Sequence, residues 1–384
     1  MKMSIYLDYN ASAPIDKSVL EVMIETYMKS YGNADSRTHI YGNQASAQVE
    51  RAREQVAALL KIRREEVIFT SGSTESNNMA ILGMRNYAIQ NNKRHIVTST
   101  IEHKSVLEPI KQLMKEGFDV DFVKPNRSGR IEAKKVLEKV REDTFLVSIM
   151  HINNETGTIQ PVKEIGDYLK RTDTWFHVDA AQSCGKLVVD LQNLNYDLLS
   201  ISAHKMYGPQ GIGALIRRYR DGKKPPLKAI MYGGGQENGL RPGTLPVALI
   251  VGLGHACSLS LKNSTEYCKL YKQNEKDILE LLQNSGTRYI INGDLKYASG
   301  NTLNISFIDI DSEAFMLLAK NHVGVSNGSA CNSSSRYETS YVLKEMGLDQ
   351  KVIEEAVRIS WGRKKLDFSE LQKVLIKVKA CQET

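Results

Sequence analysis

Strand-like apolar segments alternate with helix-like segments along the chain up to about Gly254, and this alternation limits the fold more than any other feature. In residues 46–60, for example, Val49, Ala52 and Val56 fall on one helical stripe. The candidate strands lie at residues 65–70, 94–100, 145–152, 174–180 and 197–202. The candidate helices lie at 46–60, 105–117 and 164–172, and residues 71–88 are expected to form a loop and a helix. Alternation of this kind predicts an α/β fold with a mostly parallel sheet and helices on both faces.

The pattern changes after Gly254. A charged helical stretch comes first, and shorter strand and helix signals follow it. The expected helices lie at residues 264–284, 312–321 and 367–379, and the expected strands at 302–307 and 357–361. A chain of 384 residues is long enough for two hydrophobic cores. We therefore expect a second, smaller α+β domain at the C-terminal end.

Charge and hydropathy exclude several classes of protein. The 51 basic and 44 acidic side chains leave a net charge of +7, but the charges are interspersed. The locally basic residues 61–66 and 217–224 are interpreted as solvated faces, so no direct nucleic-acid contact is expected. The longest apolar run, residues 245–254, is shorter than the roughly 20 residues of a membrane helix. Residues 1–10 lack the apolar core of a signal peptide, so we expect a cytoplasmic protein without membrane contact.

The five cysteines form no Cys-x-x-Cys pair and are odd in number. Neither a disulfide framework nor a zinc site is therefore indicated, and no metal is expected. Each cysteine is best considered as a single thiol.

Lys205 follows an apolar strand candidate and lies in a Ser-Ala-His-Lys turn that precedes a glycine-rich stretch. A lysine at the edge of a sheet can form a Schiff base when its pKa is depressed. For a His-Lys pair alone, a surface lysine would be the better interpretation.

Two further segments favour a chemical role for Lys205 over a surface position. Asp179 ends an apolar strand candidate, where a carboxylate needs a cation to remain ionised, and a protonated ring nitrogen would serve. A loop of Gly72, Ser73 and Thr74 joins a strand to a helix and can offer backbone N–H groups to a phosphate. By itself this loop is also consistent with a simple helix cap.

A Schiff-base lysine, an acid for a ring nitrogen and a phosphate cradle are what pyridoxal 5'-phosphate requires of a protein. Their order resembles the fold-type-I enzymes of the class V aminotransferase family, and within it the cysteine desulfurases of the NifS/IscS type. The matching stretches are YLDYNASAP, YGNADS, SGSTESNN, IEHKSVLEP, MHINNETGTIQP, HVDAAQS, SAHKMYGPQGIGAL, GGGQENGLRPGT, SNGSAC and VRISWG. The resemblance implies a large cofactor-binding domain of residues 16–255 and a small domain of residues 1–15 and 256–384.

The resemblance also implies roles for single residues. Lys205 would bind the cofactor covalently, Asp179 would pair with the ring nitrogen, and Gln182 would bond the ring hydroxyl. His103 would stack on the ring and act in catalysis. The other cofactor-binding residues would be Ser73, Thr74, Asn154, Ser202, His204 and Thr244. Thr244 would reach a phosphate in the neighbouring subunit, which implies a homodimer with shared active sites.

Three residues match the family positions that orient the amino-acid substrate: Asn33, Asn154 and Arg358. The guanidinium fork of Arg358 suits an α-carboxylate. Structural alternatives remain, because Asn33 could be a turn residue and a lone arginine on a strand is more often a surface residue.

Cys331 lies among serine, glycine and asparagine in residues 326–337, where small side chains keep a thiol accessible. The resemblance makes Cys331 the nucleophile that takes sulfur from L-cysteine, leaving L-alanine and a persulfide. The persulfide would pass to sulfur-acceptor proteins of iron–sulfur cluster assembly, tRNA thiolation or DNA phosphorothioation. Cys184 is expected to pack near the cofactor strand, and Cys257, Cys268 and Cys381 fall in helical patterns.

The chain departs from the family pattern in two places. Thr339 stands where a proline is common, and Ala34 and Asp35 replace the more usual proline and serine. Two other functions stay open: a pyridoxal-phosphate aminotransferase or β-lyase in which Cys331 is incidental, and a non-catalytic assembly subunit. Lys205, Asp179 and His103 argue against the latter, because a scaffold does not need them.

Overall fold

A seven-stranded sheet forms the centre of the computed structural model, which describes residues 4–327 and 339–383. The spatial order of the strands is β2-β8-β7-β6-β5-β3-β4. Their bounds are β2 Val67–Thr70, β3 His95–Ser99, β4 Asp119–Val123, β5 Thr144–Met150, β6 Trp175–Asp179, β7 Leu198–Ser202 and β8 Gly213–Arg217. Neighbours from β4 to β7 are parallel, and β8 runs antiparallel to both β7 and β2. The predicted mostly parallel sheet is therefore confirmed.

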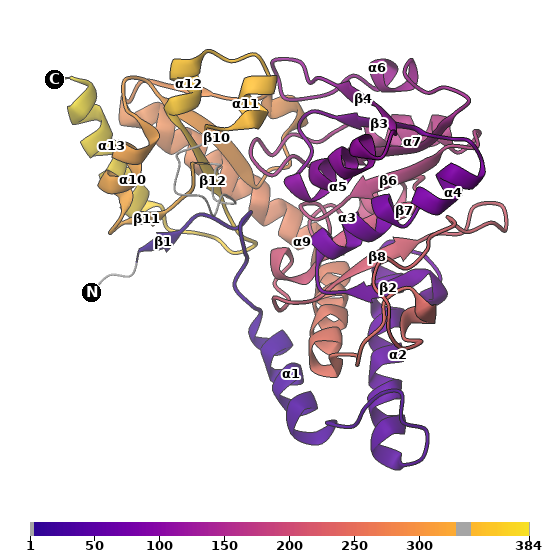
Figure 1. Ribbon diagram of the computed structural model, residues 1–384. Helices are drawn as coiled ribbons and strands as arrows, with labels where there is room; N and C mark the ends of the chain where they lie inside the picture. The colour runs from indigo at the N-terminus through magenta and orange to yellow at the C-terminus, as the bar shows by residue number, and fades with distance from the viewer. Residues whose placement is uncertain (1–3, 328–338, 384) are drawn as a thin grey trace.

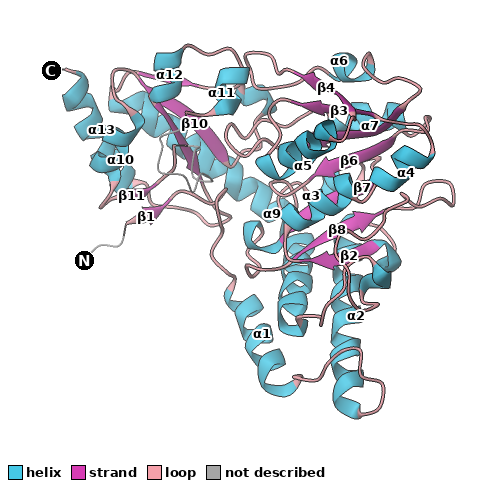
Figure 2. Ribbon diagram, in the orientation of Figure 1, coloured by secondary structure: helices cyan, strands magenta, loops and turns pink. Residues whose placement is uncertain are grey.

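Both faces of this sheet are buried, because alternate side chains of each strand enter two different cores. On β5, Val147 belongs to one core and Leu146 to the other. The side with Leu146 is covered by α3 Ser73–Leu82, α4 Arg85–Gln90 and α5 Lys104–Lys115. The side with Val147 is covered by α2 Ile40–Leu60, α6 Ala133–Leu137, α7 Val162–Leu169, α8 Val188–Gln192 and the start of α9 Val247–Ser285. Figure 2 shows the resulting layers of helices around the strands.

The second core lies around a three-stranded antiparallel sheet of order β12-β10-β9. The strands are β9 Tyr289–Ile291, β10 Thr302–Phe307 and β12 Ala356–Ser360, and the helices of this part are α10 Ser312–Ala319, α11 Tyr341–Glu345, α12 Gln350–Glu354 and α13 Ser369–Gln382. Close to the start of the chain, β1 Ile5–Tyr6 pairs in parallel with β11 Val323–Gly324. Short 3₁₀ turns occupy η1 Arg64–Glu66, η2 Ala203–Lys205, η3 Glu237–Gly239 and η4 Leu295–Tyr297.

Helix α9 joins the two parts. Its first half contributes Ile250 and Leu253 to the core of the large sheet, and its second half contributes Tyr271 and Ile278 to the small one. The expected boundary between residues 255 and 256 thus falls inside one continuous helix, and the division into domains stays a prediction.

Helix α1 Lys17–Lys29 and the start of α2 extend away from the sheet (Figure 1). Among the described residues, no helix combines the length and the apolar character that a membrane crossing requires.

Candidate active site

A small pocket lies where the parallel strands β5 and β6 end, the usual position of ligands in open α/β sheets. Its lining residues are Ser73, His103, Met150, Ile152, Asn154, Asp179, Ala181, Gln182 and Lys205. Six of these nine were expected from the sequence to bind cofactor or substrate. The turns after three strands and the first turns of two helices thus converge on one site.

Asp179 is the last residue of β6 and is buried. Its Oδ1 accepts a hydrogen bond from Ala181 N at 2.9 Å, and its Oδ2 accepts one from Asn77 Nδ2 at 2.9 Å. Asn77 Nδ2 also donates to Ser105 Oγ at 2.8 Å. These donors hold the carboxylate in place at the edge of the pocket.

His103 is the N-cap residue of α5. Its Nδ1 accepts a hydrogen bond from Ser105 N at 3.1 Å and lies 2.8 Å from Ser105 Oγ. Burial, and then the neighbouring charge of Lys205, lower the pKa of His103 below its ordinary value. A neutral ring that accepts at Nδ1 carries its proton on Nε2. His103 can therefore offer a donor or a neutral ring face.

The first turn of α3 forms the expected anion cradle. The N-cap of α3 is Gly72, which has no side chain to satisfy the first N–H groups. A Cβ on Gly213 would lie 2.7 Å from the Cα of Gly72, so glycine permits this close approach. Ser202 Oγ would lie 3.6 Å from a Cβ on Gly72, which places Ser202 beside the cradle. Thr74 follows in the same turn with an exposed side chain.

His204 precedes Lys205 in η2, and its Nδ1 lies 3.2 Å from Ser12 Oγ. Burial, followed by the charge of Lys205, lowers the pKa of His204 to about 4. The imidazole is therefore neutral at physiological pH.

Arg358 lies at the middle of β12, and only 4% of its side chain is exposed. Its Nη2 contacts Asp8 Oδ1 at 2.7 Å, and its Nη1 donates to Asn154 O at 3.1 Å. Arg358 thus connects the small sheet with the pocket and is not the surface residue that a lone arginine would suggest.

Asn33 and Thr244 are two of the predicted residues that do not line this pocket. Asn33 is exposed in the loop between α1 and α2, where its Oδ1 accepts from Asp35 N at 3.0 Å as in an Asx turn. Thr244 is exposed just before α9, and the nearby Arg241 pairs with Glu75 of α3 at 2.9 Å. The roles of Asn33 and Thr244 stay predictions that a second subunit would have to complete.

Cys331 lies outside the described residues, but the chain on both sides of it is anchored at the site. Ser326 forms two backbone hydrogen bonds with Arg358, at 3.2 and 2.6 Å. Ser340 donates to the buried carboxyl of Glu155, and Tyr341 OH donates to Glu102 O at 2.6 Å. The described residues on either side of Cys331 thus lie beside Arg358 and beside the neighbours of Asn154 and His103.

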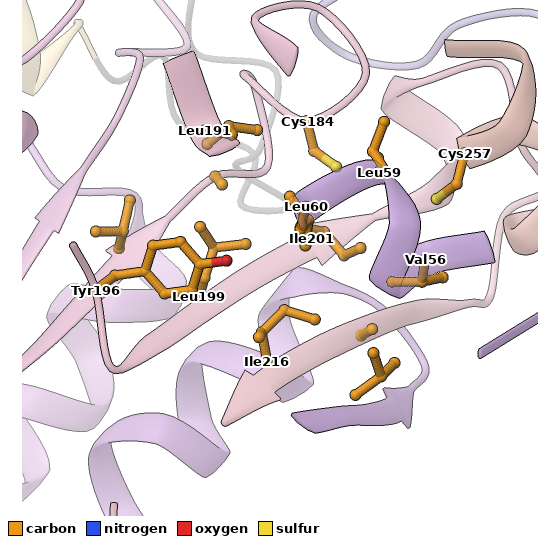
Figure 3. Packing of buried hydrophobic residues seen from close by; sticks show 14 of the residues in the cluster. Val56, Leu59, Leu60, Cys184, Leu191, Tyr196, Leu199, Ile201, Ile216 and Cys257 are labelled. Atoms are coloured by element: carbon orange, nitrogen blue, oxygen red, sulfur yellow. The ribbon is translucent and has the colours of Figure 1, made fainter. Parts of the chain in front are cut away.

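The four described cysteines differ in exposure: Cys184 and Cys257 are buried, Cys268 is half-buried and Cys381 is exposed. Cys184 and Cys257 are buried with Leu59 and Leu60 in the core of the large sheet (Figure 3). Burial raises the pKa of the Cys184 thiol to about 12 and also raises that of Cys257. Neither can supply a thiolate near neutral pH, which agrees with the expectation that Cys184 is a packed residue.

Sequence reasoning missed several polar residues that support the site: Asp8, Asn10, Asn77, Ser105, Glu155 and Lys186. Asn77 follows Ser73 by one helical turn, so the spacing could have indicated it. Ser105, Glu155 and Lys186 also lie within four residues of a predicted residue, whereas Asp8 and Asn10 reach the site only in the folded chain. Asp8 and Arg358, for example, are 350 positions apart.

The residues present fit pyridoxal 5'-phosphate. The α3 N-terminus offers N–H groups to a phosphate, Asp179 offers a carboxylate to a ring cation, and Lys205 offers an amine on the same pocket. Asn154 Oδ1 is also buried here without a hydrogen-bond partner in the described part of the chain. A buried acceptor of this kind needs a donor, which a ligand can provide.

Comparison with known proteins gives a consistent result. A model of the aminotransferase class-V family matches residues 5–367. A cysteine desulfurase IscS of Vibrio campbellii is 44% identical over 370 residues, which cover 94% of this chain and 89% of that protein. A solved NifS-like protein aligns with a TM-score of 0.89 at 36% identity, covering 99% of this chain and all of that one. The structure of SspA in complex with cysteine aligns with a TM-score of 0.79 at 38% identity, covering 94% of this chain and 100% of that one.

Proposed function

The chain belongs to the class-V aminotransferase family, and from this premise we propose that it is a cysteine desulfurase, which takes sulfur from L-cysteine and leaves L-alanine. One observation carries the proposal: Lys205, Asp179 and His103 line a single pocket. Relatives and structural neighbours include a cysteine desulfurase and a protein in complex with cysteine. These similarities support the overall reaction, and the geometry of the pocket supports the residue roles that we propose.

Pyridoxal 5'-phosphate would be held by residues of this pocket and of the α3 cradle. Ser73, Thr74, Ser202 and His204 would bind its phosphate, and Lys205 would bind it covalently. When bound, this cofactor acts as an electron sink that makes the substrate Cα–H acidic. Asp179 supports that chemistry, because a buried carboxylate fixed by Asn77 favours a protonated ring nitrogen.

The remaining groups bind the substrate and move protons. Arg358 is already oriented by Asp8 and Asn154, so its fork is preorganised for an α-carboxylate. Asn154 and, from a second subunit, Asn33 would complete the substrate side. The Lys205 amine would take up the proton from the substrate Cα. His103, neutral and protonated on Nε2, is suited to donate or relay a proton.

Sulfur transfer is the task of Cys331. Its thiolate attacks the substrate sulfur, so an S–S bond forms and the substrate C–S bond breaks. The electron pair of the broken bond stays on the substrate carbon, which takes up a proton and becomes the methyl group of alanine. The anchors at Ser326 and Ser340 support this role, because both lie next to substrate-binding residues.

A homodimer is supported by an exposed apolar face. Ile24, Tyr27 and Met28 lie on one side of α1, and Tyr31 stacks on Tyr41 of α2 with ring centroids 5.5 Å apart. Met28 and Tyr31 are 74% and 70% exposed, which is unusual for apolar side chains without a partner. Light scattering should give the mass of two chains, and Tyr27→Asp with Met28→Asp should shift the mass to that of one.

The protein persulfide would then be passed to acceptor proteins, with iron–sulfur cluster assembly, tRNA thiolation and DNA phosphorothioation as the candidate pathways. Disulfides are rare in cytoplasmic proteins, and the four described cysteines are all free thiols. We therefore assign the protein to the cytoplasm.

The test uses the full chain loaded with pyridoxal 5'-phosphate and given L-cysteine. Wild type should release sulfide and L-alanine in the presence of a thiol reductant, and Cys331→Ser should lose this release while still binding the cofactor. Without reductant, peptide mass spectrometry should find one added sulfur on Cys331. Unchanged sulfide release from Cys331→Ser would contradict the persulfide step and favour a β-lyase or aminotransferase. Cys381→Ser, in an exposed cysteine of α13, is the matched control and should behave as wild type.

A further inference from the structure

Lys186 is a buried amine that the proposed mechanism does not use. It lies four residues after Gln182, in the turn between β6 and α8, and is only 6% exposed. Its Nζ donates to Gln182 Oε1 at 3.2 Å and to Asn10 Oδ1 at 3.3 Å. Within the described part of the chain, no carboxylate lies within 4.0 Å of this amine. A lysine buried against two neutral amides is costly, and such groups are concentrated at functional sites.

The contacts of Lys186 determine which way the Gln182 carboxamide points. Lysine has donors only, so the atom of Gln182 that faces Nζ must be the acceptor oxygen. The Gln182 Nε2 then donates to Asn10 O at 2.9 Å. A rotated amide would set donor against donor at Lys186 and acceptor against acceptor at Asn10. The second N–H of Gln182 is left for the pocket that this residue lines.

Asn10 is fixed in the same way. Its Oδ1 accepts from Lys186 and, at 3.3 Å, from Asn301 Nδ2. Its Nδ2 then donates to Thr302 Oγ1 at 2.8 Å and to Asn154 O at 3.2 Å. One amine thus orients two carboxamides, and the second of them supports the substrate residue Asn154.

We propose that Lys186 is a positioning residue of the cofactor site, whose ammonium group holds the Gln182 carboxamide so that its N–H faces the anionic ring oxygen of pyridoxal 5'-phosphate. The inference rests on the proposed function, because it requires that cofactor in the pocket. Lys186 acts through Gln182 and does not itself line the pocket.

The charges around Lys186 make its contribution depend on pH. Burial, then Lys205 and Arg358, lower the pKa of Lys186 to about 7. The other groups that face it are the neutral amides of Gln182 and Asn10, and Cys268 donates to its backbone O at 3.5 Å. An anionic ligand in the pocket favours the ammonium form of Lys186. The affinity that Lys186 adds is therefore fully present below about pH 7 and declines above it.

The experiment measures the dissociation constant of pyridoxal 5'-phosphate from the full-length apoprotein between pH 6 and 9. Lys186→Met should weaken binding by about 10- to 100-fold at pH 6.5, the range for a lost hydrogen bond from a charged donor. The ratio of the dissociation constant of Lys186→Met to that of wild type should fall as the pH rises towards 9. Lys163→Met, at an exposed lysine that pairs with Asp167, is the control and should bind as wild type.

A double-mutant cycle separates positioning from a structural role. In a Gln182→Ala background, Lys186→Met should change the dissociation constant by less than about twofold, because the group it positions is absent. Thermal unfolding of the Lys186→Met apoprotein should show a folded chain. A full additive loss in the cycle, or a ratio that does not vary with pH, would overturn the inference.

Borohydride reduction of the wild-type protein with pyridoxal 5'-phosphate, followed by peptide mass spectrometry, distinguishes the two proposals. No adduct on Lys205 would overturn the cofactor assignment and this inference together. An adduct on Lys205 combined with wild-type affinity in Lys186→Met would overturn only the role of Lys186.

Discussion

Arg358 and Asp8 form an ion pair of 2.7 Å between residues that are 350 positions apart in the chain. The pair joins β12 to the segment that follows β1, and the Arg358 side chain is almost fully buried. Asn154 O accepts from the same guanidinium. The proposed substrate arginine is therefore held by charge from one side before any substrate binds.

Asp8→Asn should destabilise the fold, because it leaves a buried guanidinium without its counter-charge. We expect the free energy of unfolding in urea to fall by about 3 kcal/mol or more. The Michaelis constant for L-cysteine should also rise, because Arg358 is no longer oriented. Asp309→Asn removes exposed pairs with Arg288 and Lys351 and should cost about 1 kcal/mol or less. Equal losses in the two variants would show that burial of the Asp8 pair is unimportant.

Asn77→Ala should weaken cofactor binding. The change removes a donor from Asp179 and from Ser105, and so loosens both the carboxylate and the hydroxyl beside His103. Each lost hydrogen bond to a charged group corresponds to about 10- to 100-fold in affinity. Fluorescence titration of the apoprotein with pyridoxal 5'-phosphate measures the effect. Asn78→Ala is the matched control, because Asn78 bonds only Thr74 O among the described contacts, and an equal loss there would contradict the assignment.

Glu155→Gln should change how stability depends on pH. Burial raises the pKa of Glu155 from its ordinary value of 4.5 to about 7, although Ser340 and Arg358 act in the opposite direction. Between these two pH values the Glu155 carboxyl keeps its proton in the folded chain and loses it in the unfolded chain. The contribution of Glu155 to folding stability is therefore fully present below about pH 4.5. It is lost as the pH rises to about 7.

Relative to wild type, Glu155→Gln should therefore gain stability with rising pH, by up to about 3 kcal/mol at pH 8. Urea unfolding at intervals from pH 5 to pH 8 measures this difference. Glu132→Gln, at an exposed glutamate that pairs with Lys135, should follow the wild-type curve throughout. Parallel curves for Glu155→Gln and wild type would mean that Glu155 is ionised in the folded protein.

Alkylation should distinguish the exposed cysteine from the buried ones by the rate at which each reacts. In the folded protein at pH 7.5, iodoacetamide should modify the exposed Cys381 within minutes and leave Cys184 and Cys257 unmodified, because both are buried with raised pKa values. Peptide mass spectrometry over time measures each site. In urea all three should react alike. Modification of Cys184 at the rate of Cys381 in the folded chain would contradict the burial described here and reopen its candidacy as the nucleophile.

The sequence predicted the elements of the large sheet well because its strands are continuous apolar runs. Residues 197–202 were predicted as a strand, and Leu198–Ser202 form β7. Helix α2 begins at Ile40, earlier than the predicted residue 46, because the His39 side chain caps it by accepting from Gly42 N. The strands β4, β8 and β9 and the short pair of β1 and β11 were not predicted. The strands β1 and β11 have two residues each, which is too few to show a periodicity.

The sequence by itself determined the chemical groups: a lysine after one strand, an acid after another, and small residues before a helix. Local periodicity and motif order are sufficient for that, because these residues occupy the ends of regular elements. Only the tertiary structure decided which polar groups hold these residues in place. Asn77, Asp8 and Glu155 find partners in distant segments, and Lys186 does so through Asn10. A buried polar group is stable only when its partners are in place, and the packing of the whole chain provides those partners.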